Sequence, residues 1–99
     1  MGQKSSLISR NVTIRGSRTS LRMEKTIWDA VGEVCQRENL NIHDLCTLID
    51  TNRHITNRTA AIRAFIVAYY RNAATEDGHR RAGHGNGTEE NLLNVLRNL

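Results

Sequence analysis

Hydrophobic and polar residues alternate in two short segments near the start of the chain, 11–15 and 18–23. Alternation with a period of two is the pattern of a β-strand that buries one face. The dipeptide Gly16-Ser17 separates the two segments and predicts a turn or a break in the chain. The first segment is therefore either a second strand or an extended arm that tracks a binding partner.

Further along the chain, the apolar positions change to a helical period. Ile27, Trp28 and Val31 begin a stripe that continues for several turns on one side of a helix. Asn41 is a good N-cap for the next helix, and a third helix can begin after Thr56 or Asn57. The pattern predicts helices at about 24–38, 42–51, 58–74 and 89–98.

Composition divides the chain into four parts. We expect a flexible N-terminal arm at 1–10, a folded domain at 11–74, a glycine-rich flexible linker at 75–87 and a short amphipathic helix at 88–99. The fold class that follows is mainly α, with short β structure at its N-terminal end.

Charge is distributed unevenly along the 99 residues, although the net charge is only +4. Residues 1–25 contain six basic residues and one acidic residue, whereas residues 26–50 contain one basic residue and five acidic ones. Because Lys and Arg displace counterions from phosphates, the basic N-terminal quarter favours a polyanionic partner.

Several classes of protein do not fit this sequence. It has no apolar run of about 18 residues that could span a membrane, and its start lacks the apolar stretch of a secretory signal. Two cysteines do not make a disulfide scaffold, so we expect a cytoplasmic protein. Neither a nucleophile–base spacing nor a metal-ligand spacing is present, and we expect no enzyme, no cofactor and no metal site.

A short basic strand placed before helices has a particular requirement. A lone strand leaves backbone groups unpaired along its edges, and a second copy of the chain can supply the missing partner. Leu21 and Met23 would then face a core shared with Trp28, while Arg18, Ser20 and Arg22 would face outward. A two-stranded ribbon fits the major groove of DNA, where Arg can donate two hydrogen bonds to guanine.

The segment from Arg15 to Glu24, together with Trp28, Leu45 and Ile49, resembles the small bacterial ribbon-helix-helix domain family over roughly residues 11–72. The resemblance implies an intertwined homodimer that shares a two-stranded antiparallel ribbon, here with an extra third helix. It also implies that the dimer binds double-stranded DNA and that alternate strand residues read bases. Carried over to this sequence, the base-reading residues are Arg18, Ser20 and Arg22.

Phosphate contacts are a second expectation. The resemblance implies an anchor at the start of the second helix, around Asn41 and His43, and we expect Arg15 and Lys25 to contact phosphates as well. Asp44 departs from this pattern, because a carboxylate in the first turn of the helix repels a phosphate.

Other noticeable residues have structural interpretations that we favour over functional ones. We expect Trp28 to lie in the core, and Cys35 and Cys46 to be buried thiols. The arginines of the third helix region can form a second phosphate surface, but we favour a solvated face that pairs with the acidic segment. These arginines are Arg53, Arg58, Arg63 and Arg71.

Two functions are compatible with the sequence. The first is a homodimeric, sequence-specific DNA-binding protein that acts as a transcriptional repressor or autoregulator. The alternative is a protein-interaction module, such as an antitoxin or adaptor. Its C-terminal helix would then bind another protein through Leu92, Val95, Leu96 and Leu99.

Overall fold

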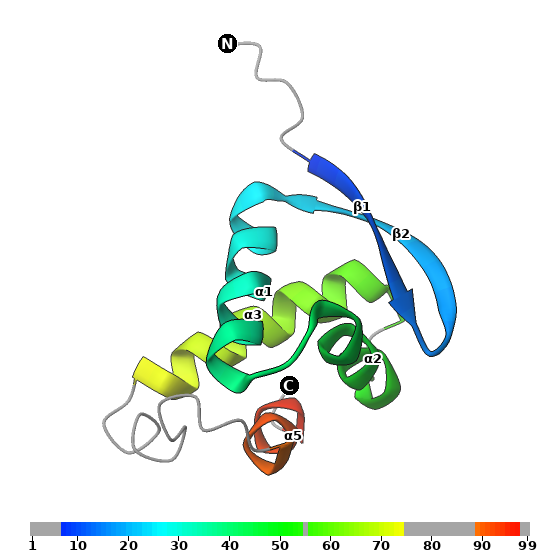
Figure 1. The fold of residues 1–99 in the computed structure, drawn as a ribbon. Coiled ribbons are helices and arrows are strands. Elements are labelled where there is room, and N and C mark those ends of the chain that lie inside the picture. The colour runs from blue at the N-terminus through cyan, green and yellow to red at the C-terminus, as the bar shows by residue number, and fades with distance from the viewer. Residues whose placement is uncertain (1–6, 55, 75–88, 98–99) are drawn as a thin grey trace, which may run out of the picture.

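The structure is a computed structural model that describes residues 7–54, 56–74 and 89–97. A two-stranded sheet is followed by helices that pack beneath it (Figure 1). The predicted linker 75–87 and the residue Leu99 lie outside the described residues. In chain order the elements are β1 (Leu7–Ile14), β2 (Ser17–Glu24), α1 (Lys25–Glu38), α2 (Ile42–Asn52), α3 (Arg58–Ala74) and α5 (Glu89–Arg97).

The two strands form an antiparallel hairpin within the chain, with Ile14 opposite Ser17 next to the turn. The turn is Arg15-Gly16, and both residues have positive φ, 52° and 83°. Two positive φ angles in a two-residue loop define a type I′ turn, whose twist matches that of the strands. The segment 11–15 is therefore the end of a second strand and its turn, which settles the question that the sequence left open.

Two details of the sequence prediction need correction here. Strand β1 begins at Leu7, so residues 7–10, which we assigned to a flexible arm, are part of the sheet. In addition, β2 does not need another chain for its first partner, because β1 pairs with it. The fold class itself is confirmed, since a two-stranded antiparallel ribbon precedes the helices and the extra helix α3 is present.

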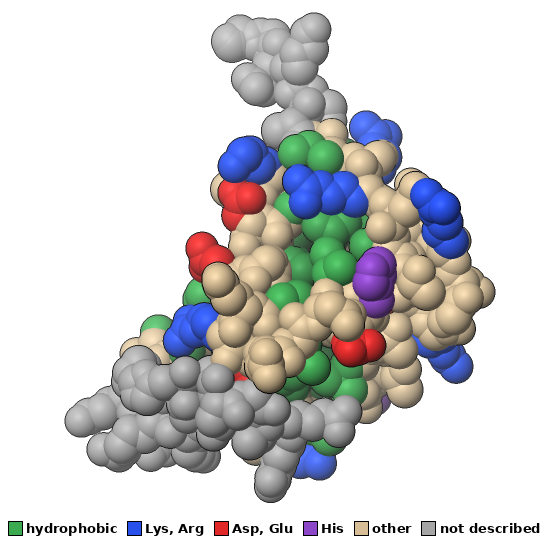
Figure 2. All heavy atoms as spheres, in the orientation of Figure 1, with side chains coloured by type: hydrophobic (Ala, Val, Ile, Leu, Met, Phe, Trp, Pro, Cys, Tyr) green, Lys and Arg blue, Asp and Glu red, His purple; other side chains and the backbone are tan. Residues whose placement is uncertain are grey.

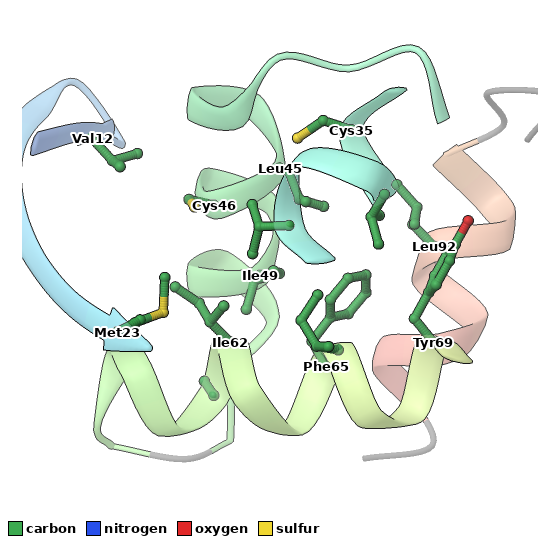
Figure 3. Close-up of a cluster of buried hydrophobic side chains, with 14 of the residues drawn as sticks. Val12, Met23, Cys35, Leu45, Cys46, Ile49, Ile62, Phe65, Tyr69 and Leu92 are labelled. Atoms are coloured by element: carbon green, nitrogen blue, oxygen red, sulfur yellow. The ribbon is translucent and has the colours of Figure 1, made fainter. Parts of the chain in front are cut away.

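The inner face of the hairpin closes one side of a continuous apolar core. Leu21 and Met23 on β2 are buried together with Trp28 and Val31 of α1, as the alternating and helical patterns predicted. The Trp28 indole also donates a hydrogen bond from Nε1 to the backbone carbonyl oxygen of Ile8, 2.9 Å away. On the helical side the core contains Leu45, Cys46, Ile49, Ile62, Phe65 and Tyr69 (Figure 3).

The ends of the helices follow the capping residues in the sequence. Asn41 accepts a hydrogen bond from the backbone amide of Asp44 at 2.8 Å, and Asn57 accepts one from that of Ala60 at 3.0 Å. Helix α1 ends where Asn39 adopts a left-handed conformation with φ of 58°. The four helices lie within about one residue of their expected bounds, and no helix in the described part of the chain is long and apolar enough to span a membrane.

Helix α5 packs on the chain itself, against α3 and α2 (Figure 1). Leu92, Val95 and Leu96 are all buried there, with exposed fractions of 1%, 3% and 2%. We expected these side chains, in the alternative function, to enter a groove on another protein. The structure corrects that expectation, because the same apolar face already completes the core of its own chain.

Candidate nucleic-acid interface

The outer face of the hairpin is polar and exposed. Arg18, Ser20 and Arg22 all lie on this face of β2, as the alternation predicted. Their cross-strand neighbours on β1 are Thr13, Asn11 and Ser9, respectively, and all three are exposed. Six adjacent side chains therefore present donors and acceptors on one side of a ribbon, while the apolar side chains on the other side are buried in the core.

The register of the hairpin also determines which backbone groups of β2 remain open. A two-residue turn makes Ile14 and Ser17 a hydrogen-bonded pair, and such pairs alternate along an antiparallel ladder. The backbone N–H and C=O groups of Arg18, Ser20 and Arg22 therefore point away from β1. In residues 7–54, 56–74 and 89–97, nothing donates to or accepts from these groups. The outer edge of β2 is open to another strand.

The opposite edge, on β1, is covered by α2 at its turn end. The backbone amide of Thr13 donates to Nδ1 of His43, and the backbone amide of Arg15 donates to Oγ1 of Thr47, each at 3.0 Å. Because Nδ1 accepts, a neutral His43 imidazole carries its proton on Nε2. His43 is exposed, so Nε2–H is available to an outside acceptor.

The start of α2 offers less to a phosphate than we expected. The Asn41 side chain caps the helix and uses its oxygen for the amide of Asp44. The amides of Ile42 and His43 are the first two of the helix, and the cap leaves them open. The exposed carboxylate of Asp44 lies in the same turn, and its charge opposes an anion.

The other two expected phosphate ligands already have acidic neighbours. Lys25 Nζ lies 2.9 Å from Oδ2 of Asp29, and Arg15 Nη1 lies 3.7 Å from Oδ2 of Asp50. The side chains of Lys25 and Arg15 are 72% and 62% exposed. The Lys25–Asp29 pair is exposed and therefore weak, and the Arg15–Asp50 contact is longer than a hydrogen bond, so both cations can turn toward a phosphate.

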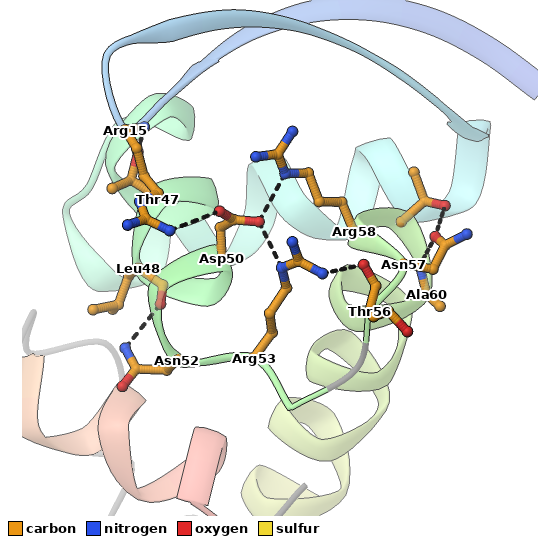
Figure 4. A network of polar contacts seen from close by, with 11 residues as sticks. Arg15, Thr47, Leu48, Asp50, Asn52, Arg53, Thr56, Asn57, Arg58 and Ala60 are labelled. Atoms are coloured by element: carbon orange, nitrogen blue, oxygen red, sulfur yellow. Dashed lines mark hydrogen bonds and ion pairs between the residues drawn. The ribbon is translucent and has the colours of Figure 1, made fainter.

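Sequence reasoning did not find the cluster around Asp50 as a candidate site. The Asp50 side chain is buried, and its Oδ1 accepts from Nε of both Arg53 and Arg58 at 2.8 Å (Figure 4). Burial raises the pKa of this carboxyl, but the hydrogen bonds and charges of the two arginines outweigh burial, so the pKa lies below its ordinary value. The sequence signal was the proximity of these arginines to an acidic residue, which we took for a solvated face.

The pairing of basic residues with the acidic segment is confirmed for Arg53 and Arg58. Arg63 pairs instead with Glu24 at the end of β2, where Nε lies 2.9 Å from Oε1. The hydrogen bond and charge of Arg63 add to a backbone hydrogen bond in lowering the pKa of Glu24. Arginine side chains of this region therefore fasten α3 to α2 and to the hairpin.

The predicted site residues fall into separate groups. The base-reading residues share one face of β2, and Asn41 and His43 lie together at the start of α2. Arg15 lies in the turn, and Lys25 begins α1. Figure 2 shows Lys and Arg side chains standing out along the hairpin and a strip of hydrophobic side chains beside it.

Comparison with known proteins agrees with this geometry. A family model described as a ribbon-helix-helix domain matches residues 7–70. The chain belongs to the ribbon-helix-helix domain family. No curated protein and no solved structure matches it. Domains of this family are generally DNA-binding transcription regulators that dimerise, and they are not typically enzymes.

The extent of the match adds one structural point. It begins at Leu7, the first residue of β1, and ends at Tyr70 in α3. The matched domain thus includes all of β1 and most of the extra helix α3, whereas α5 lies beyond the matched residues.

Proposed function

We propose that this ribbon-helix-helix protein is a cytoplasmic, sequence-specific DNA-binding homodimer that represses or autoregulates transcription. The observation that carries the proposal is the exposed polar face of β2, where Arg18, Ser20 and Arg22 stand on one side of a strand whose other side is buried. A strand held in this way presents its side chains at a fixed spacing to its binding partner.

The chemistry of these side chains suits base edges. Arg donates two parallel hydrogen bonds to O6 and N7 of guanine, and Ser can bond to several bases. Strand β1 adds an amide at Asn11 directly opposite Ser20, and Asn pairs well with adenine. The sheet thus offers both charged and neutral readers to the major groove.

The open edge of β2 supports the dimer. Two copies can pair their β2 strands antiparallel, which satisfies the outward backbone groups of Arg18, Ser20 and Arg22 in both. The two-fold axis then places both sets of base-reading side chains on the same face of the sheet. Partly buried apolar side chains beside the core, including Ile27 and Ile42, give a second copy further surface to cover.

Phosphate contacts would hold the ribbon in register. We assign them to Arg15, Lys25, His43 through Nε2–H, and the open amides at the start of α2, where Asn41 acts as the helix cap. Because Asp44 opposes an anion in that turn, the contact there is expected to be weaker than the contacts of the Arg and Lys side chains.

The decisive experiment is selection from random duplex DNA with the purified chain, followed by native mass spectrometry of the complex. We expect a sequence motif with two-fold symmetry and two chains per duplex. Arg22→Ala should then cost about 1–3 kcal/mol of specific binding. Arg71→Ala, a matched change on the exposed side of α3, should cost little. Unchanged affinity in Arg22→Ala would contradict base reading by β2.

A further inference from the structure

An open surface depression of about 320 Å³, called the turn cavity below, lies beside the hairpin turn. It is separate from the outer face of the ribbon, because none of Arg18, Ser20 and Arg22 lines it. Its walls come from the turn, the end of α2 and the loop before α3, and the lining residues are Arg15, Asp50, Thr51, Arg53, His54 and Thr56.

Positive charge predominates around this cavity. Three guanidinium groups, those of Arg15, Arg53 and Arg58, surround the single carboxylate of Asp50 (Figure 4). Oδ1 of Asp50 accepts from two of them, whereas the buried Oδ2 has no hydrogen-bond partner in the described part of the chain. Arg15 faces Oδ2 at 3.7 Å, which is beyond hydrogen-bonding distance.

The backbone conformation of Arg15 also supports a role for its side chain at this cavity. Its φ of 52° is left-handed, a conformation that is unfavourable for a residue with a Cβ. Asn and Gly are the residues that suit this position of a type I′ turn. An arginine here gives up turn stability and gains a long cationic side chain at the mouth of the turn cavity.

From these observations we infer a binding site for a monoprotonated phosphate group, as carried by inorganic phosphate or a phosphomonoester. The anionic oxygens would accept from Arg15 and from the hydroxyl groups of Thr51 and Thr56. The remaining P–OH would donate to Oδ2 of Asp50, which gives that buried oxygen the partner it lacks. Arg15 is long and exposed, so its guanidinium can turn from Oδ2 toward the ligand.

The requirement for a proton distinguishes this ligand from DNA. A phosphodiester of the DNA backbone has no P–OH and leaves Oδ2 unpartnered, whereas a monoester near neutral pH is partly monoprotonated. Sulfate has the shape of phosphate but carries no proton at this pH. A comparison of phosphate, sulfate and a phosphodiester therefore distinguishes a site that needs a P–OH group from a site that binds any anion.

The test is a calorimetric titration of the full chain with inorganic phosphate, sulfate and dimethyl phosphate at equal ionic strength. We expect phosphate to bind and the other two to bind about tenfold more weakly, the effect of one charge-assisted hydrogen bond. Arg15→Asn should weaken phosphate binding about tenfold without lowering the free energy of unfolding, since Asn suits the turn. Arg71→Asn, on the exposed side of α3, should leave phosphate binding unchanged.

Asp50→Asn gives a second and independent measurement. It replaces the acceptor with an amide that can donate, so the preference for phosphate over sulfate should disappear. Equal binding of phosphate and sulfate by the unmodified chain, or full phosphate binding by Arg15→Asn, would overturn the inference. Dimethyl phosphate binding as tight as that of phosphate would also overturn it and assign the turn cavity to the DNA backbone. These titrations contain no DNA, so their failure and a failure of base reading by Arg22 are distinguishable.

Discussion

The hydroxyl group of Tyr69 donates a hydrogen bond to Oε2 of Glu38 at 2.5 Å, and both side chains are buried. This bond connects the middle of α3 to the last residue of α1. Burial is the main reason why the pKa of Tyr69 lies above its ordinary value, and the adjacent Glu38 raises it further. Oε1 of Glu38 has no hydrogen-bond partner in the described part of the chain. The hydrogen bond from Tyr69 to Oε2 therefore compensates this buried carboxyl group for its loss of contact with water.

We therefore expect Tyr69→Phe to lower the free energy of unfolding by about 2–3 kcal/mol, because it leaves a buried carboxyl without a donor. Tyr70→Phe is the matched control. The Tyr70 hydroxyl donates to Glu33, which is exposed, and the loss there should be about 0.5 kcal/mol. Urea denaturation of both variants measures the difference. Equal losses of unfolding free energy in the two variants would show that the buried Tyr69–Glu38 bond stabilises the fold no more than the exposed Tyr70–Glu33 bond.

The Asp50 carboxyl predicts a dependence of stability on pH. Its pKa is lowered in the folded chain, so its contribution is present above the ordinary carboxyl pKa and is lost as the pH falls through the lower folded value. Asp50→Asn should cost about 1.5–3 kcal/mol at pH 7. The difference from the unmodified chain should shrink below about pH 4.

Denaturation at several pH values tests this, with Asp29→Asn as the control. Asp29 forms an exposed pair with Lys25, and its removal should cost little at any pH. A difference between Asp50→Asn and the unmodified chain that stays constant from pH 7 to about pH 3 would contradict the assignment of the lowered pKa.

His43 accepts a hydrogen bond from the Thr13 amide, and in the proposed function it also contacts a phosphate; two variants can distinguish these roles. His43→Ala removes the acceptor for the amide of Thr13 and should cost about 1 kcal/mol of stability, with faster hydrogen exchange at Thr13. His43→Asn places an amide oxygen near the position of Nδ1, so it should keep most of that stability. Because neither variant presents the Nε2–H group of the imidazole, DNA binding should weaken in both. Slow exchange at Thr13 in the Ala variant would show that the bond is not significant.

The open edge of β2 can be blocked without touching the hairpin ladder. The Ser20 amide points away from β1, so Ser20→Pro removes an outward donor and should abolish strand pairing between copies. Asn11→Pro is the matched change, because the Asn11 amide points away from β2 on the other strand. Analytical ultracentrifugation should show monomers for the first variant and dimers for the second. Dimers in both would place the interface elsewhere.

The sequence predicted the helices well because their apolar stripes and capping residues are local signals. It missed the first half of β1 for a physical reason. Arg10 occupies an inner-face position of the strand, where the alternation calls for an apolar residue, and its guanidinium lies 5.2 Å from the centre of the Trp28 ring. A cation stacked on an aromatic ring satisfies that position, and no count of apolar residues detects it.

The candidate site was predictable only in part. Arg18, Ser20 and Arg22 follow from the period of a strand, and their exposure is what the alternation requires. The cluster around Asp50 adds Arg15, which is far away in the sequence, to the nearby Arg58, and it depends on how the hairpin turn packs against the end of α2. The periodicity of residues within one helix or strand does not predict how that turn and helix pack together.

The bonds from Thr13 and Arg15 to α2 have a consequence for the size of the assembly. A sheet with two open edges can keep adding strands and grow into a fibre. In this hairpin α2 occupies the turn end of the β1 edge through the amides of Thr13 and Arg15. If two β2 strands pair as proposed, the outermost strand on each side is a β1 strand whose turn end is blocked, so the contacts that hold the hairpin on the helices also oppose further strand addition there.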